Sequence, residues 1–264
     1  MQLDPAMLER VGKPQDYEAP AVTRLNTTVP FYRHVTPVER LIKRTMDVVC
    51  SAVALLIFGL FLPFIALAIK LDSRGPVFYS QTRVGINRRA GDRRRHLISG
   101  EKPGRRNAQQ SRDRRKIVAE GRHFEILKLR TMRVNSESEG VRWAEKNDPR
   151  ITRVGKLLRL TRLDEFPQFW NVLKGDMSIV GPRPERPPFI TLLSGEVPGY
   201  LHRLRFKPGI TGLAQIEIGY DQSIASVHRK VELDLKYITR FSLWLDIKIL
   251  FRSVKVVLTG QGAC

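Results

Sequence analysis

The sequence has few cysteines and none of the common nucleotide-binding loops. Its 264 residues include two cysteines, Cys50 and Cys264, which excludes a disulfide framework and a four-cysteine zinc site. The patterns G-x-x-x-x-G-K-[ST], G-x-G-x-x-G and G-x-S-x-G are absent. The five histidines are scattered, without the spacing of a zinc-binding helix. The most familiar signatures of metal-dependent, nucleotide-binding and serine-hydrolase enzymes are therefore missing.

Acidic residues are scarce relative to basic ones. There are 26 Asp and Glu against 46 Lys and Arg, which gives a formal net charge of +20. A charge of this size indicates an anionic partner, which composition leaves open among nucleic acid, an acidic membrane surface and phosphorylated substrates. With 42% hydrophobic residues the chain can bury a core, and its length suits one domain with appendages.

Charge is absent altogether from residues 48–69. This apolar run of 22 residues is about as long as the ~20 residues that a helix needs to cross a bilayer core. Lys43 and Arg44 precede it and Lys70 follows it, so the positive-inside rule gives no clear direction. The run is compatible with a single transmembrane anchor, and also with a helix that enters the membrane and returns to the same face.

Two residues inside the run bear on that choice. Pro63 removes a helical hydrogen bond and forces a kink. Ser51 is the only hydroxyl in the run that could partner broken backbone. We therefore favour a re-entrant membrane helix over residues 39–74, broken at the proline.

A basic segment covers residues 87–122, with 13 Lys and Arg against four acidic residues. Its simplest interpretation is a solvated insertion, and its functional one is a patch for anionic lipid head groups. It has no aromatic residue for base stacking, so no nucleic-acid partner is expected.

The remaining sequence predicts a polar N-terminal arm, residues 1–38, and a mostly helical α/β membrane-associated domain, residues 75–264. Residues 76–85 and 124–132 have strand-like composition and predict a small β-hairpin whose connection carries the basic segment. The other expected elements are a helical region at 148–174 broken near Pro167, an extended loop at 181–188, a turn-rich loop at 207–215 and helices at 227–239 and 241–258. The last is amphipathic: it is either an interfacial helix, with Trp244 in the head-group zone, or a core-facing one.

The candidate chemistry lies between residues 161 and 184, in TRLDEFPQFWNVLKGDMSIVGPRP. Asp164 and Glu165 are adjacent carboxylates, which could be a solvated surface pair or, at a helix end, could share a divalent cation or a phosphate. Arg183 stands between two prolines as a preorganised phosphate-binding group. Two acids for a metal and several fixed cations are the parts that phosphoryl transfer requires.

Three further basic residues complete the predicted phosphate site. Lys128 and Arg130 are two apart on a predicted strand and should point to the same face, and Arg159 precedes the carboxylates. Beside a membrane-inserted helix, these residues indicate a phosphorylated lipid as one substrate.

The same residues give the chain a recognisable pattern. KRTMDVV with the proline-containing apolar helix, GPVFYSQTRVG, FEILKLRTM, LDEFPQFWNVLKGDMSIVGPRPE, KPGITGLAQ and SLWLDIKILFRSVKVVL follow one another from residue 37 to 263. In this order they resemble the bacterial sugar transferase family, the monotopic phosphoglycosyl transferases that act on polyprenyl phosphate.

The resemblance implies a reaction: transfer of a sugar 1-phosphate from a UDP-sugar to undecaprenyl phosphate, with release of UMP. This is the first step in assembling a capsule, exopolysaccharide or O-antigen. It implies a covalent phosphosugar intermediate on Asp164, a metal- or proton-handling role for Glu165, a Mg²⁺ ion and phosphate binding by Arg183. It also implies a re-entrant helix with both ends cytoplasmic, hence the lipid of the bacterial inner membrane as a partner and a catalytic domain on its cytoplasmic face.

Two features depart from the family pattern: the basic segment, and IEIGYD after Gln215. The second bears on sugar choice, so no donor sugar is carried over. The alternative function is a membrane-anchored basic scaffold or nucleic-acid-binding protein without catalysis, which would leave the block from Asp164 to Arg183 unexplained. A homo-oligomer is compatible with everything above.

Overall fold

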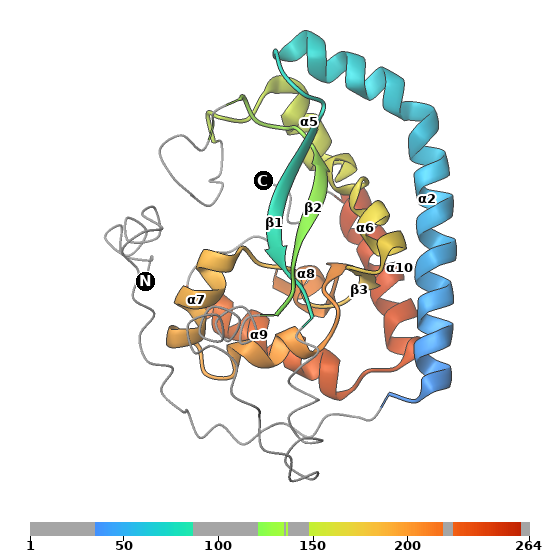
Figure 1. Cartoon of the computed structure of the whole chain (residues 1–264), viewed down its shortest axis with the longest axis vertical. Helices are drawn as coiled ribbons and strands as arrows, with labels where there is room; N and C mark the ends of the chain where they lie inside the picture. The colour runs from blue at the N-terminus through green and yellow to red at the C-terminus, as the bar shows by residue number, and fades with distance from the viewer. Residues whose placement is uncertain (1–34, 87–120, 135, 137–147, 219–223, 260–264) are drawn as a thin grey trace, which may run out of the picture.

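A computed structural model of the chain describes residues 35–86, 121–134, 136, 148–218 and 224–259 (Figure 1). Most of the expected polar arm and of the basic segment lies outside the described residues. The α-helices are α2 (Pro37–Asp72), α5 (Arg153–Leu160), α6 (Gln168–Lys174), α7 (Pro187–Glu196), α8 (Leu213–Ile218), α9 (Ile224–Thr239) and α10 (Leu243–Thr259). Two 3-10 turns, η1 (Leu163–Glu165) and η2 (Tyr200–Arg205), lie between them. The prediction of a mostly helical chain is confirmed.

Helix α2 is long, apolar and continuous. Its first turn is closed by a capping box of Thr36 and Glu39, and Pro37 occupies a first-turn position that needs no N–H donor. It is long and apolar enough to cross a membrane by length and composition, and 11% of its most apolar 18 residues are buried. The helix bends past its midpoint (Figure 1), and Pro63 lies inside it without interrupting the helical geometry. The break predicted at Pro63 is therefore absent from the structure, where the helix continues through the proline.

One face of α2 packs on the rest of the protein. Asp47, Ser51, Phe58 and Ile69 are buried, at spacings of four, seven and eleven residues that place them on one side of the helix. The Asp47 carboxylate accepts hydrogen bonds from Ser178 Oγ (3.1 Å) and the Ile179 N–H (3.0 Å). The outer face carries large exposed side chains: Val38, Leu41, Ile42, Val49, Val53, Leu56, Ile57, Leu60, Phe61, Phe64, Leu67 and Leu71.

Lys43 and Arg44 bind protein rather than flanking a membrane span. Lys43 Nζ pairs with Asp246 Oδ2 (2.6 Å), at the start of α10. The Arg44 guanidinium donates to the carbonyl oxygens of Val172 (2.6 Å) and Leu173 (2.7 Å), which satisfies the C-terminal end of α6. Ser51 is fully buried at the protein-facing side, twelve residues before the proline. Its expected role beside a membrane break is wrong, because its side chain faces the globular part.

The predicted hairpin is confirmed. Strands β1 (Phe78–Val84) and β2 (His123–Leu129) pair antiparallel, with Phe78 opposite Leu129 and Val84 opposite His123. A second pair, β3 (Ser178–Val180) and β4 (Gly209–Thr211), runs parallel. Residues 207–215 therefore form a strand and the start of α8 rather than the expected turn-rich loop. This close approach requires glycine, since a Cβ on Gly209 would overlap the Gly181 backbone.

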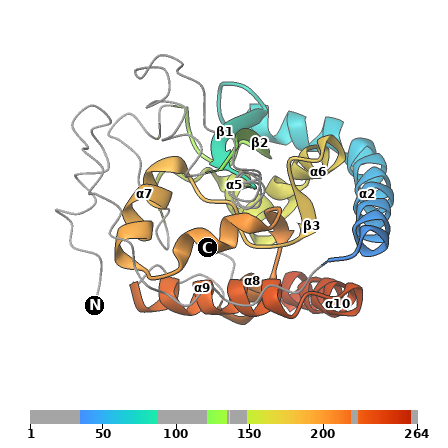
Figure 2. The same cartoon turned by 60° about the horizontal axis from the view of Figure 1, so that its bottom comes forward.

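The sequence left open whether α10 is a core-facing or an interfacial helix. In the structure it has both a buried face and an exposed apolar face. Ile249 is 1% exposed and belongs to the largest buried cluster, with residues of α6, β3 and α9. Trp244 is 62% exposed on the same helix. Figure 2 shows α9 and α10 along one side of the molecule and α2 at its edge. One side of α10 is thus core, and another is an exposed apolar surface.

Candidate active site

The carboxylate pair lies in the short turn η1, between α5 and α6. Helix α5 ends at Leu160, and Arg162 then adopts a left-handed conformation (φ 58°), the only positive φ among the described non-glycine residues. That reversal starts the 3-10 turn, and Pro167 caps the start of α6 instead of ending a helix. A left-handed conformation is strained for a residue with a side chain, and such strain is concentrated at functional sites. The predicted break near Pro167 is confirmed, and its consequence is to present both carboxylates at the end of a helix.

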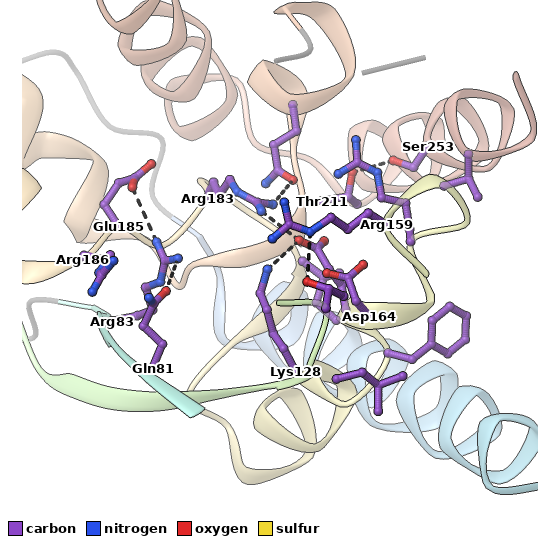
Figure 3. A pocket seen from close by; sticks show the side chains of 18 of the residues that line it. Gln81, Arg83, Lys128, Arg159, Asp164, Arg183, Glu185, Arg186, Thr211 and Ser253 are labelled. Carbon is purple, nitrogen blue, oxygen red and sulfur yellow. Dashed lines mark hydrogen bonds and ion pairs between the residues drawn. The ribbon is translucent and has the colours of Figure 1, made fainter. Parts of the chain in front are cut away.

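Glu165 holds two of the predicted cations. Its Oε1 accepts hydrogen bonds from Lys128 Nζ (3.0 Å), on β2, and from Arg183 Nη2 (2.8 Å), in the Pro-Arg-Pro loop (Figure 3). Burial opposes ionisation, but the charges of Arg183 and Lys128 hold the pKa of Glu165 well below its usual range. Glu165 is therefore ionised throughout the physiological range, and it is a positioning group for the two cations.

Asp164 has a different environment. It is 7% exposed, and no hydrogen bond to its carboxylate is found within the described part of the chain. Burial raises its pKa, the charge of Lys128 opposes that rise, and the charge of Glu165 adds to it. A desolvated carboxylate that is not held by hydrogen bonds keeps its oxygens available for a new bond. The two adjacent acids thus differ: Glu165 is anchored by two cations, and Asp164 has no hydrogen-bond partner in the described chain.

Arg159 and Arg130 separate in the structure. Arg159 Nε donates to Thr131 Oγ1 (2.9 Å), and Figure 3 shows Arg159 on the same side of the pocket as Asp164. Arg130 donates from both terminal nitrogens to the carbonyl oxygens of Ser73 and Arg74 (2.7 Å each), just beyond the end of α2. Arg130 therefore does not join Lys128 at the predicted phosphate site. Its guanidinium has a structural role instead, because both terminal nitrogens are hydrogen-bonded at the end of α2.

Sequence reasoning missed the residues behind Arg183. Arg203, in η2, donates to the Arg183 carbonyl oxygen (3.0 Å) and to the Tyr200 hydroxyl (2.9 Å). Its guanidinium also pairs with Asp234 of α9 (2.8 Å), and both side chains are almost fully buried. This buried pair fixes the backbone of the Pro-Arg-Pro loop. Its members are 31 residues apart in sequence, within otherwise ordinary helical patterns, and no local signal could have found them.

These groups open into a large cavity of about 1290 Å³. At one end lie the carboxylates with Lys128, Arg159 and Arg183. A second polar group gathers on the other side of the view in Figure 3, from Gln81, Arg83, Glu185 and Arg186. The cavity exceeds the usual ~300–1,000 Å³ of a small-molecule site and has room for two substrates.

The residues of the cavity fit the predicted Mg²⁺ site in part. No group of three or more His, Cys, Asp or Glu side chains that could hold a metal is found among the described residues. Glu165 Oε1 already accepts from two cations, so the carboxylate of Asp164 and the second oxygen of Glu165 are the groups that could hold the metal. Mg²⁺ is commonly held by one or two carboxylates together with substrate phosphates, so one protein carboxylate is a sufficient donor set.

Comparison with known proteins agrees with this geometry. A model of the family described as "Bacterial sugar transferase" matches residues 38–92 and 102–260, with its interruption inside the basic segment. The chain is 39% identical over 228 residues to "UDP-N-acetylgalactosamine-undecaprenyl-phosphate N-acetylgalactosaminephosphotransferase" of Aeromonas hydrophila, covering 86% of this chain and 46% of that protein.

Two relatives are named "UDP-glucose:undecaprenyl-phosphate glucose-1-phosphate transferase". The protein of Caulobacter vibrioides is 34% identical over 268 residues, covering 99% of this chain and 87% of the relative. That of Escherichia coli K12 is 39% identical over 229 residues, covering 86% and 42%. The chain thus spans less than half the length of two of these three relatives and most of the third. The family match extends over α2, both strand pairs and the complete carboxylate site, and the chain belongs to the bacterial sugar transferase family.

Proposed function

We propose that this chain transfers a sugar 1-phosphate from a UDP-sugar to undecaprenyl phosphate and releases UMP. The observation that carries the proposal is the division of labour between Glu165, paired with Lys128 and Arg183, and Asp164, which is buried without a hydrogen-bonding partner in the described chain. The names of the relatives support the two substrates. A scaffold without catalysis would have no use for a desolvated carboxylate beside three cations.

The first half-reaction forms a covalent intermediate on Asp164. A carboxylate oxygen of Asp164 attacks the phosphorus that carries the sugar, and the bond from that phosphorus to the bridging oxygen of the diphosphate breaks. UMP leaves with that oxygen. Arg183, Lys128 and Arg159 screen the repulsion between the anionic nucleophile and the diphosphate, since all three line the cavity around Asp164.

The second half-reaction regenerates the enzyme. A phosphate oxygen of undecaprenyl phosphate attacks the same phosphorus, the bond to Asp164 breaks, and undecaprenyl diphosphate sugar is formed. When bound, Mg²⁺ would neutralise charge on the phosphates, with Asp164 as its protein ligand in the substrate complex. Because UMP leaves before the lipid reacts, ping-pong kinetics are expected.

We also propose that α2 is a re-entrant membrane helix on the cytoplasmic face of the inner membrane. Two observations support this: the outer face of α2 exposes large apolar side chains along its whole length, and the helix contains a proline and bends past its midpoint (Figure 1). Basic flanks no longer support it, since Lys43 and Arg44 are bound to protein.

The orientation is tested with single cysteines at the two ends of α2. Arg40→Cys and Arg74→Cys are placed in a chain whose Cys50 and Cys264 are replaced by serine. In intact cells, a membrane-impermeant maleimide should label neither end of a re-entrant helix, and both after cell lysis. Labelling of one end in intact cells would establish a transmembrane span instead.

The reaction is tested with purified protein, Mg²⁺, undecaprenyl phosphate and a panel of UDP-sugars, with nucleotide products separated by chromatography. UMP released by the unmodified chain and not by Asp164→Asn supports the proposal and identifies the donor. Release of UDP instead would mean that a glycosidic bond is formed, and would refute it.

A further inference from the structure

The cavity has an apolar wall that the transfer chemistry itself does not explain. Beyond the carboxylates and arginines, it is lined by side chains of the C-terminal half of α10, with contributions from β4 and α8. The apolar residues of this wall are Ile210, Ala214, Ile216, Ile247, Leu250, Phe251, Val254, Val256 and Val257. A sugar and a nucleotide need hydrogen-bonding partners, which this wall does not provide.

Most of the α10 part of the wall is one helical face, and Val256 lies outside that face. Residues 247, 250, 251, 254 and 257 follow one another at spacings of three, one, three and three, which places them on one side of a helix. The core-facing residue Ile249 points elsewhere and is 1% exposed. Phe251 is 75% exposed and Val254 is 57% exposed, so the outer part of this face is not packed against the described part of the chain, whereas Leu250 is partly buried against the core.

The two hydroxyl groups on this wall are already hydrogen-bonded. Thr211 and Ser253 lie 2.6 Å apart between their hydroxyl oxygens, and Ser253 donates onward to the Ile249 carbonyl oxygen (2.8 Å). Figure 3 shows both residues on the side of the pocket where Arg159 and Asp164 lie. The wall therefore begins next to the phosphate-binding cations, and its two hydroxyl groups make no further polar demand on an apolar ligand. Gln215 of α8 also lines the cavity, and its Nε2 is buried without a hydrogen-bond partner among the described residues.

We propose that the face of α10 formed by Leu250, Phe251, Val254 and Val257 binds the first isoprene units of the polyprenyl acceptor. This inference rests on the proposed function, because it assigns one substrate of that reaction to one wall of the cavity. A ligand that joins a phosphate to a long apolar chain matches a cavity whose cations are continuous with an exposed apolar helix face. The polar group around Arg83 and Glu185 is then left for the nucleotide sugar.

The test compares two sets of exposed apolar residues on the same helix. The double variant Phe251→Ser/Val254→Ser removes apolar surface inside the cavity. Trp244→Ser removes a comparable exposed surface on α10 outside the cavity wall, and is the matched control for membrane contact. Each variant is assayed in detergent with undecaprenyl phosphate and with dimethylallyl phosphate, which has one isoprene unit.

The double variant should lower kcat/KM for undecaprenyl phosphate about tenfold or more, from the loss of two apolar contacts. Its selectivity over the short acceptor should fall by a similar factor, and Trp244→Ser should leave that selectivity unchanged. The UMP burst from donor alone, before any acceptor is added, should be the same in all three proteins. An equal loss in both variants would mean that α10 only contacts the membrane, and unchanged selectivity in the double variant would also overturn the inference.

Failure of the proposed function gives a different result, namely no UMP burst in the unmodified chain. A binding measurement then still tests the wall. A prenyl phosphate with a diazirine on its first isoprene units should crosslink to peptides of α10, and the double variant should reduce that crosslinking while Trp244→Ser should not. Crosslinks confined to α2, or the same yield in the double variant, would refute the assignment.

Discussion

The two adjacent carboxylates should affect stability in opposite directions. Glu165 is 11% exposed in its side chain and is shared by Lys128 (3.0 Å) and Arg183 (2.8 Å). Its lowered pKa means that the ionised form stabilises the fold, with the contribution fully present above the unfolded pKa and lost as the pH falls through the folded one. Glu165→Gln at pH 7.5 leaves two cations without their counter-charge, and should be destabilising.

The magnitude follows from the burial of the partners. Removing one member of a fully buried ion pair costs about 3–5 kcal/mol, and an exposed pair contributes about 0.2–1 kcal/mol. Lys128 is 19% exposed and Arg183 is 38% exposed, so the first pair lies nearer the buried limit and the second nearer the exposed one. We expect Glu165→Gln to lower the free energy of unfolding by about 2–4 kcal/mol, which corresponds to a Tm lower by about 4–16 °C for a domain of this size.

Asp164→Asn is the matched control, one residue away. The raised pKa of Asp164 means that the folded protein binds this proton more tightly than the unfolded chain, so the ionised carboxylate lowers stability at pH 7.5. The variant should therefore unfold at the same or a higher temperature while losing activity. Thermal unfolding of both variants in the same detergent, followed by circular dichroism, tests this. Equal destabilisation by the two substitutions, or a stable Glu165→Gln, would refute the division of roles.

Three further predictions concern pH, packing and the loop support. The size of the UMP burst should rise with pH, and the rise should lie above the ordinary titration range of Asp because the pKa of Asp164 is raised. Lys128→Met should move this rise to higher pH, because the lysine charge opposes the raised pKa of Asp164. A stopped-flow pH profile that does not move in the variant would contradict this. Gly155→Ala should lower the free energy of unfolding by about 1–3 kcal/mol, measured by thermal unfolding, because the new Cβ would overlap the Thr131 carbonyl. Gly195→Ala is the control and should not destabilise the protein, because its Cβ would meet nothing within 4 Å. Asp234→Asn should lower kcat/KM about tenfold for both the UDP-sugar and the acceptor, since it loosens the support of Arg183, which lies beside the reacting phosphorus in both half-reactions; unchanged values for both substrates would contradict this.

Much of the architecture could be predicted from local pattern. The hairpin followed from β-rich composition at residues 76–85 and 124–132, and the observed register confirms it. The helices after residue 224 followed from their periodicity. The β3–β4 pair could not be predicted, because strands of three residues have almost no periodicity and their pairing depends on the close approach of two glycines.

The site was predictable in its residue types, and less so in its pairings. Adjacent carboxylates and an arginine between prolines are visible in the sequence, and the structure brings Lys128, Glu165 and Arg183 together. Which of the two acids is anchored by cations depends on long-range contacts. The same limit explains why the roles of Arg130 and Lys43 could not be predicted. Both donate to carbonyl oxygens of their own chain. In the sequence, such a residue cannot be distinguished from one that contacts a phosphate or a lipid head group.

The central claim is that Asp164 carries the sugar phosphate, and one measurement tests it directly. The protein is incubated with an accepted UDP-sugar and Mg²⁺ in the absence of undecaprenyl phosphate, quenched in acid, digested and analysed by mass spectrometry. We predict a phosphosugar adduct on the peptide containing Asp164, formed together with one equivalent of UMP and lost when undecaprenyl phosphate is added before the quench. UMP released only after acceptor is added, with no adduct on that peptide, would contradict the account.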